Sequence, residues 1–218
     1  MDAKNLIPPS PSAQAYAVDA DQGDVFTISD PFALFADWFA LAGTMERNDP
    51  NAMALATVDG NGLPDVRMVL LKDFDACGLT FYTNMESAKG RQLGANPKAA
   101  ACFHWKSIRR QVRFRGDVSP VSEDEANDYF ASRARGAQLG AHVSAQSREL
   151  ADRDRFEADI AALEKEYEGR DVPRPDNWFG YRLKPSEIEF WVNRPFRLHD
   201  RLQYTRKDGG WVKRALYP

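Results

Sequence analysis

From residue 52 onward the sequence is a succession of short β-type segments divided by turns, which limits the chain to a strand-dominated fold. Asp59-Gly60 followed by Asn61-Gly62 is a strong hairpin signal, and residues 178–217 have the pattern of three or four further strands. Because strands and helices do not alternate as in βαβ units, we expect a mainly β protein of the α+β type, an antiparallel barrel with peripheral helices. The segments before the tail are AMALATV, LPDVRMVLLKDF, GLTFYTN, AAACFHW and RQVRFRGDVSPV.

Four helices are predicted around these strands. Asp30 before Pro31 is a typical start, with the aspartate as N-cap and the proline in the first turn. Ser87 is expected to begin a second helix, which stops before Pro97. Ser122 with Glu125 predicts a capping box for a third helix, and residues 149–168 form a charged amphipathic fourth. The first helix carries an apolar stripe of Phe32, Phe35, Trp38, Phe39 and Ala42.

Length and composition favour a soluble protein with one folded domain. We expect residues 1–30, which are rich in Pro, Ser, Ala and Asp, to form a mobile arm, and residues 31–218 to form a single domain. The formal charge of −3 does not favour general attraction to nucleic acid or membranes. No stretch approaches the roughly 18 apolar residues of a membrane span. The two cysteines, Cys77 and Cys102, form no disulfide framework, which indicates a cytoplasmic location.

The stretch FWVNRPFRLHDRLQY, residues 190–204, contains an unusual row of cationic side chains. If the part after Pro195 is a strand, Arg197, His199 and Arg201 point to one face. Such a row repels itself and is costly to bury alone. The pattern therefore predicts that this face meets an anion or an electron-rich ring.

Other anion sites are suggested, each with a simpler alternative. Arg67 and Lys72 bracket an apolar strand, and taken alone they fit two exposed charges at its ends better than an anion site. The helix start at Ser87, with Lys89 in its first turn, combines backbone N–H groups, a hydroxyl and positive charge, as a phosphate requires. Tyr129 and Arg133 are four residues apart and are predicted to share one helical face, or they are simply a surface pair. The basic segment KSIRRQVRFR, residues 106–115, fits a half-exposed edge strand or a nucleic-acid surface.

The sequence shows no pattern typical of a metal site or of a catalytic nucleophile. His104, His142 and His199 show no ligand spacing with one another or with a cysteine. The sequence contains no GxSxG motif, no Walker loop and no GxGxxG motif. Redox or group-transfer chemistry would therefore depend on a bound organic cofactor.

Taken together, these segments resemble the pyridoxamine/pyridoxine 5′-phosphate oxidases. The resemblance covers about residues 31–218, and RLHDR after EFW is its most specific part. It implies a homodimeric split β-barrel that binds FMN at the subunit interface. The matching segments are RMVLLK (67–72), FYTN (81–84), SAKGRQL (87–93), RRQVRFRG (109–116), YFASRARG (129–136), AQSRE (145–149), IEFW (188–191) and RLHDR (197–201).

The resemblance implies roles for individual residues. Lys72, Tyr129 and Arg133 are expected to bind the substrate phosphate, and Arg197 and His199 to orient the substrate and assist catalysis. Some of the FMN contacts are expected to come from the partner chain. The residues expected to bind FMN are Arg67, Met68, Val69, Leu70, Tyr82, Thr83, Ser87, Lys89, Gln111, Gln146, Ser147, Trp191 and Arg201.

The reaction implied by the resemblance is oxidation of pyridoxine 5′-phosphate (PNP) or pyridoxamine 5′-phosphate (PMP) by O2. Pyridoxal 5′-phosphate (PLP) and hydrogen peroxide are the products, with ammonia from the amine. This sequence departs from the family pattern at Ala88, Ala137 and His142, and it has no Arg before Arg47. The alternatives are a sister FMN oxidase of the phenazine-pathway type, a non-enzymatic flavin or PLP carrier, and a nucleic-acid module that uses residues 106–115.

Overall fold

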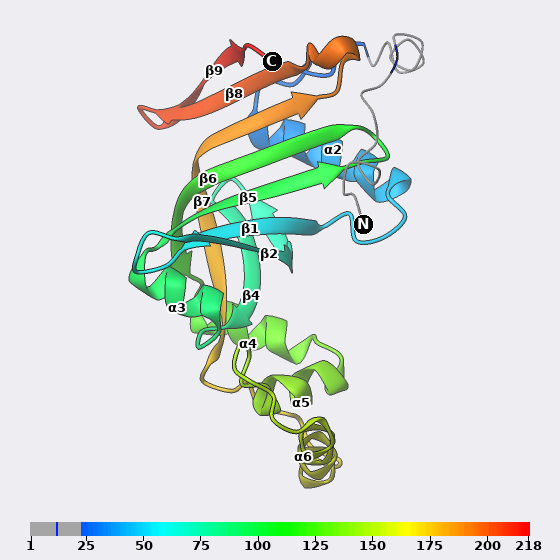
Figure 1. Ribbon diagram of the computed structural model, residues 1–218, viewed down its shortest axis with the longest axis vertical. Coiled ribbons are helices and arrows are strands. Elements are labelled where there is room, and N and C mark those ends of the chain that lie inside the picture. Colours follow the sequence, from blue (N-terminus) through cyan, green and yellow to red (C-terminus); the bar gives the residue numbers. More distant parts are fainter. Residues whose placement is uncertain (1–11, 13–22) are drawn as a thin grey trace, which may run out of the picture. The chain divides into compact units, whose positions relative to one another are not determined.

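The computed structural model describes residue 12 and residues 23–218 (Figure 1), and these residues group into two compact units. The terminal unit contains residues 23–50, His104–Arg113 and Glu187–Pro218. The central unit contains Asn51–Phe103 and Phe114–Ser186. The single-domain organisation over residues 31–218 stays a prediction. Most of the predicted mobile arm, residues 1–11 and 13–22, lies outside the described residues.

Nine strands in the described part of the chain form one sheet, in the order β2-β1-β5-β6-β7-β4-β3, with β8 paired to β7 and β9 paired to β8. The pairings with a recorded register are antiparallel, including the β1–β2, β4–β7 and β8–β9 pairs. The prediction of a mainly β antiparallel fold with peripheral helices is therefore confirmed. The strands are β1 (Ala52–Val58), β2 (Pro64–Leu70), β3 (Asp73–Asp75), β4 (Gly78–Asn84), β5 (Lys98–Trp105), β6 (Arg110–Pro120), β7 (Trp178–Val192), β8 (Asp200–Lys207) and β9 (Gly210–Leu216).

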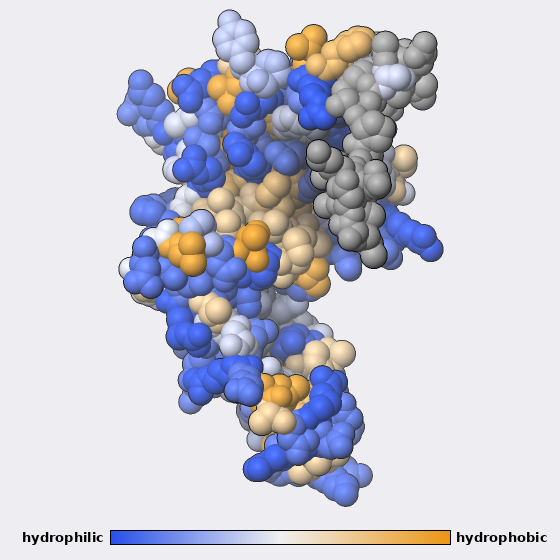
Figure 2. Space-filling model, viewed as in Figure 1, coloured by the Kyte–Doolittle hydropathy of each residue, from blue (hydrophilic) through white to orange (hydrophobic). Residues whose placement is uncertain are grey.

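The β1–β2 hairpin of the central unit forms as predicted. Asp59 Oδ1 accepts hydrogen bonds from the backbone N–H groups of Asn61 (2.8 Å) and Leu63 (2.9 Å). Gly62 has φ of 84°, which costs glycine little. In β1 alternate residues are buried, whereas β2 lies at the edge of the sheet and exposes three apolar side chains, Val66, Met68 and Leu70. Figure 2 shows apolar side chains over β1 and β2 on the viewed face.

Three of the predicted helix starts are confirmed by their capping contacts. Asp30 accepts from Ala33 N (2.8 Å) and begins α2 (Pro31–Met45). Ser87 caps α3 (Ala88–Ala95), and Ser122 with Glu125 forms a capping box on α4 (Glu123–Ala131). The charged fourth helix is α6 (Arg153–Glu166), which buries none of its residues, and the short α5 (Arg135–Val143) precedes it. None of the helices in the described part of the chain has the length and apolar character that a membrane span requires.

In the terminal unit, α2 packs an apolar side chain against β7. Trp38 is fully buried, and its ring meets Phe190 edge-on with centroids 5.1 Å apart. Burial of an aromatic side chain of this size contributes about 2–3 kcal/mol. The last residues of the predicted arm are attached here, since Trp38 Nε1 donates to Val25 O (3.3 Å) and Tyr204 Oη donates to Ile28 O (3.3 Å).

Two local predictions are wrong. The residues after Pro195 are not a strand: Pro195–Arg197 form a 3-10 turn, Phe196 and Arg197 have positive φ, and β8 begins only at Asp200. Proline has no N–H for a sheet ladder, which favours such a turn. Arg133 is not on the helical face of Tyr129, because α4 ends at Ala131.

Candidate active site

The central unit contains a pocket of about 730 Å³ between β2, β4, α4 and α5, called here the central pocket. Three cationic residues, Lys72, Lys89 and Arg133, line it, and among the described residues that line it there is no carboxylate. An uncompensated positive site of this kind favours anionic ligands. The central pocket brings together ten of the residues predicted to bind cofactor or substrate: Met68, Val69, Leu70, Lys72, Tyr82, Thr83, Lys89, Tyr129, Arg133 and Gln146.

Lys89 is a buried ammonium in the first turn of α3, 9% exposed. Its Nζ donates to Thr83 Oγ1 (3.1 Å) and to Gln146 Oε1 (3.0 Å), which leaves one of its three N–H groups for a ligand. Burial lowers the pKa of Lys89, and the nearby positive charge of Arg67 lowers it further. A bound anion would offset both effects, so this corner of the central pocket favours an anionic group.

Ser87 and Arg67 are engaged with protein groups rather than with the central pocket. The Ser87 hydroxyl is buried, accepts from Gly90 N (3.2 Å) and donates to Asn84 O (2.7 Å). Arg67 donates to Thr57 Oγ1 (2.5 Å), Asp65 Oδ2 (2.5 Å) and Gln92 Oε1 (3.0 Å). The hydrogen bond from Gln92 and the charge of Arg67 lower the pKa of Asp65. Neither Ser87 nor Arg67 lines the central pocket, so their predicted contacts with FMN stay predictions.

The predicted phosphate ligands lie together at another part of the central pocket. Lys72, between β2 and β3, places its Nζ 5.8 Å from the ring centroid of Tyr129. Arg133 lies over the Trp178 ring, 4.7 Å from its centroid. Its Nη1 is buried and has no hydrogen-bond partner in the described structure. Leaving such a donor unpaired costs about 1–3 kcal/mol, so this atom is well suited to receive an anion.

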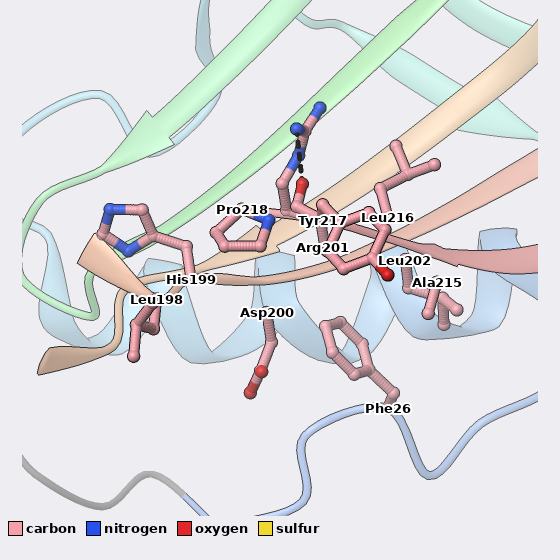
Figure 3. A pocket seen from close by; sticks show the side chains of 10 residues that line it. All are labelled: Phe26, Leu198, His199, Asp200, Arg201, Leu202, Ala215, Leu216, Tyr217 and Pro218. Atoms are coloured by element: carbon pink, nitrogen blue, oxygen red, sulfur yellow. Dashed lines mark hydrogen bonds between the residues drawn. The ribbon is translucent and has the colours of Figure 1, made fainter. Parts of the chain in front are cut away.

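The terminal unit contains a second pocket, of about 680 Å³, around His199 and Arg201 (Figure 3). Arg201 Nε donates to Glu189 Oε1 (2.9 Å), and Arg201 Nη1 donates to Tyr217 O (3.0 Å). Glu189 also accepts from Arg113 Nη2 (2.5 Å). Burial acts to raise the pKa of Glu189, but the hydrogen bond from Arg201 and the charge of Arg113 outweigh it, so its pKa is lowered. Arg201 is thus held by a buried carboxylate.

His199 lies beside Trp191, with ring centroids 4.5 Å apart. Its Nδ1 accepts from the backbone N–H of Arg194 (3.1 Å), so the neutral ring carries its proton on Nε2. Burial lowers the pKa of His199, and the charge of Arg197 lowers it further. His199 is therefore a neutral hydrogen-bond donor at neutral pH.

The remaining predicted site residues do not line either of these two pockets. Arg197 is exposed in its positive-φ turn, with φ of 61°. Gln111 and Trp191 are half-buried on β6 and β7 of the terminal unit. Ser147 is exposed in the central unit, also with positive φ. Their roles stay predictions.

Sequence reasoning missed two residues that position the others. Glu189 forms ion pairs with Arg201 and Arg113, and the Trp178 ring packs against the guanidinium of Arg133. One sequence feature could have indicated Glu189: it is a lone carboxylate inside the apolar segment IEFW. No sequence feature indicated Trp178, because the residues that it contacts come from distant segments of the chain.

Comparison with known proteins identifies the family. A family profile described as pyridoxamine 5′-phosphate oxidase matches residues 45–167. A Caulobacter vibrioides protein named pyridoxine/pyridoxamine 5′-phosphate oxidase is 56% identical over 216 residues, covering 98% of this chain and 97% of its own. A Maricaulis maris protein of the same name is 55% identical over 222 residues, covering 100% of both chains. This chain belongs to the pyridoxamine 5′-phosphate oxidase family. The resemblance predicted from the sequence motifs, and the prediction of an enzyme of this family, are confirmed.

Other matches bear on fold and assembly. Residues 178–218 match a profile described as the pyridoxine 5′-phosphate oxidase C-terminal dimerisation region. The crystal structure of PhzG from Burkholderia lata 383, in complex with tetrahydrophenazine-1-carboxylic acid, is 33% identical with a TM-score of 0.83, covering 88% of this chain and 95% of that one. A related FMN-binding protein from Nostoc punctiforme shares the fold at 21% identity, with a TM-score of 0.69 and coverage of 88% of this chain and 100% of that one.

Proposed function

We propose that this chain is an FMN-dependent oxidase that converts PNP and PMP to PLP with O2 as oxidant, releasing hydrogen peroxide and, from PMP, ammonia. The observation that carries the proposal is the central pocket, which is lined by three cations and several aromatic rings and by no carboxylate among the described residues. A flat, phosphorylated ligand matches both features. The relatives named pyridoxine/pyridoxamine 5′-phosphate oxidase at 55–56% identity support the same substrates.

FMN fits the residues of the central unit. Lys89, with the Thr83 hydroxyl and the Gln146 amide attached to it, would hold the phosphate end of the cofactor. The backbone of Met68–Leu70 and the side chain of Tyr82 would contact the rest. When bound, FMN supplies a hydride acceptor that O2 can reoxidise. Gln111, Ser147, Trp191 and Arg201 are also proposed to bind FMN, some of them from the partner chain.

The substrate is proposed to be held at its two ends. Lys72, Tyr129 and Arg133 would bind the phosphate, each charge-assisted hydrogen bond contributing about 1.5–3 kcal/mol. Arg197 and His199 would orient the pyridine ring, with His199 donating from Nε2 as a neutral group. Fixing the reacting carbon in one orientation lowers the entropic part of the barrier, which is the main contribution of these side chains.

The functional form is proposed to be a homodimer in the cytoplasm, with FMN at the interface. The match of residues 178–218 to a dimerisation region supports the dimer. The exposed apolar row on β2, Val66, Met68 and Leu70, is a surface that a second chain would cover. The sequence contains only two cysteines, Cys77 and Cys102, in unrelated contexts and without a CxxC motif, which supports a reducing compartment.

One alternative has a specific observation in its favour. The likeness to PhzG supports a sister FMN oxidase that acts on a phenazine precursor. Lys72 and Arg133 favour the phosphorylated substrate, because these two cations would otherwise lack an anionic partner. A non-enzymatic flavin or PLP carrier would bind these ligands without turnover.

The test is the visible spectrum of the purified protein together with oxygen consumption. We expect a yellow protein that consumes O2 with PNP or PMP and forms PLP. A protein that takes up no added FMN would contradict the cofactor. Flavin binding with turnover of a dihydrophenazine acid but not of PNP would favour the alternative, and flavin binding without any turnover would favour a carrier.

A further inference from the structure

Trp178, the first residue of β7, belongs to an aromatic cluster in the central pocket and stacks with two tyrosine rings of that cluster. It is 6% exposed and lines the pocket. Its ring is nearly parallel to that of Tyr82, at 5.3 Å and 7°, and to that of Tyr129, at 6.0 Å and 11°. Tyr82 and Tyr129 also stack on each other, with centroids 4.0 Å apart. Trp178 therefore connects β4 and α4, the two elements that carry these tyrosines.

The indole ring of Trp178 also packs against the guanidinium of Arg133, a residue that lies beyond the C-terminal end of α4. Residues after Ala131 have no helical ladder to orient them, and the Arg133 guanidinium instead lies 4.7 Å from the Trp178 centroid. Trp is the strongest cation–π partner among the aromatic side chains. A guanidinium held through its face keeps its N–H groups, which lie in its plane, available to an anion. Its Nη1 is buried without a hydrogen-bond partner in the described structure.

We propose that Trp178 is a positioning residue for phosphate specificity. It holds the side chains of Arg133 and Tyr129 in the positions from which they bind the substrate phosphate. This inference rests on the proposed function and adds a residue that does not itself bind the phosphate. Lys72, whose Nζ is 5.8 Å from the Tyr129 centroid, is the third cationic or phenolic group tied to the same cluster. Burial lowers the pKa of Arg133, as expected of a guanidinium held against rings without a carboxylate.

The experiment compares Trp178→Leu, Trp178→Met and Trp178→Phe in the FMN-loaded protein. Leu and Met remove the aromatic face, and Met fills the space flexibly, so the test does not depend on one variant folding. We expect the KM for PNP to rise about 5- to 30-fold in both, with kcat changed by less than about threefold. The kcat/KM for unphosphorylated pyridoxine should stay within about twofold, and Trp178→Phe should recover most of the loss.

Binding is measured in parallel, so that the inference can be tested without turnover. Equilibrium dialysis should show PLP binding weakened by the same factor and pyridoxal binding unchanged. Val172→Ala is the control, because Val172 belongs to the same buried cluster as Trp178 but does not line the central pocket. At matched loss of thermal stability it should keep the phosphate preference.

Two results would overturn the inference. One is an equal loss for PNP and pyridoxine in the Trp178 variants, and the other is an equal loss of phosphate preference in Val172→Ala. A wild-type protein that oxidises neither PNP nor PMP would contradict the proposed function instead. In that case the dialysis comparison of PLP with pyridoxal still decides whether Trp178 supports phosphate binding.

Discussion

At the scale of single residues, the site depends on one buried cation, Lys89, and one half-buried cation, Arg133, whose charges are costly without a ligand. Lys89 has two neutral hydrogen-bond acceptors and no carboxylate partner among the described residues. Arg133 has aromatic rings and an unpaired Nη1. Cations without an anionic partner lower the stability of the free protein. When an anion binds it pairs with them, so the same residues increase the affinity for that ligand.

Lys89→Met should therefore have opposite effects on binding and on stability. FMN affinity should fall about 10- to 100-fold, because a charge-assisted contact is lost. The melting temperature of the FMN-free protein should stay the same or rise, since a desolvated ammonium is replaced by an apolar side chain. Fluorescence titration and calorimetry measure the two quantities. Lys98→Met is the control, because Lys98 is exposed and paired with Asp117; equal loss of FMN affinity there would refute the assignment.

His199 should make the folded protein less stable as the pH falls from about 7 to 5. Its folded-state pKa lies below the unfolded value of about 6.5, because of burial and Arg197. Below pH 6.5 the unfolded chain binds a proton that the folded chain does not, so the free energy of unfolding decreases. The decrease ends once the pH is below the folded-state pKa. Urea denaturation of His199→Gln should show a flatter profile in this window than the wild-type protein, and an unchanged slope would contradict the role given to His199.

At the scale of elements, helix caps fix where the site-bearing segments begin. The capping box of α4 orients the helix that carries Tyr129, through Ser122 Oγ, which accepts from Glu125 N (3.1 Å). The hydrogen bonds from Ser122 and the charge of Arg182 lower the pKa of Glu125. Arg182 Nη2 donates to Glu125 Oε1 (2.7 Å), which links the cap to β7.

Ser122→Ala should lower the free energy of unfolding by about 1 kcal/mol, because the cap loses its side-chain acceptor. The KM for PNP should rise modestly, since Tyr129 is on this helix. Chemical denaturation measures the first and steady-state kinetics the second. Ser119→Ala, at an exposed position of β6, should change neither. A stability loss of the same size in the Ser119 variant would show that the capping box is not its cause.

At the scale of the whole molecule, the proposed assembly makes cofactor retention depend on protein concentration. Residues 178–218 match a dimerisation region, and two of the predicted FMN ligands, Trp191 and Arg201, lie in it. If each site uses both chains, dilution below the dimer dissociation constant should release FMN. Light scattering and flavin fluorescence, followed together during dilution, should change over the same concentration range. A monomer that keeps its flavin would contradict the shared site.

The sequence by itself determined the elements whose signals are local. The cap at Asp30, the capping box at Ser122 and the Asp59 turn each depend on residues within four positions of one another, and all three are confirmed. The family could also be predicted, because its motifs are continuous segments. The ten predicted ligands that line the central pocket were predictable only through that family pattern.

Only the tertiary structure decided how the cationic side chains are held. The strand expected after Pro195 is a turn, because proline cannot donate to a sheet ladder, so the row of Arg197, His199 and Arg201 does not form by strand alternation. Arg201 instead depends on Glu189, and Arg133 on Trp178. These partners are brought together by strand register and ring packing between segments that are distant in the chain, and no local propensity encodes such contacts.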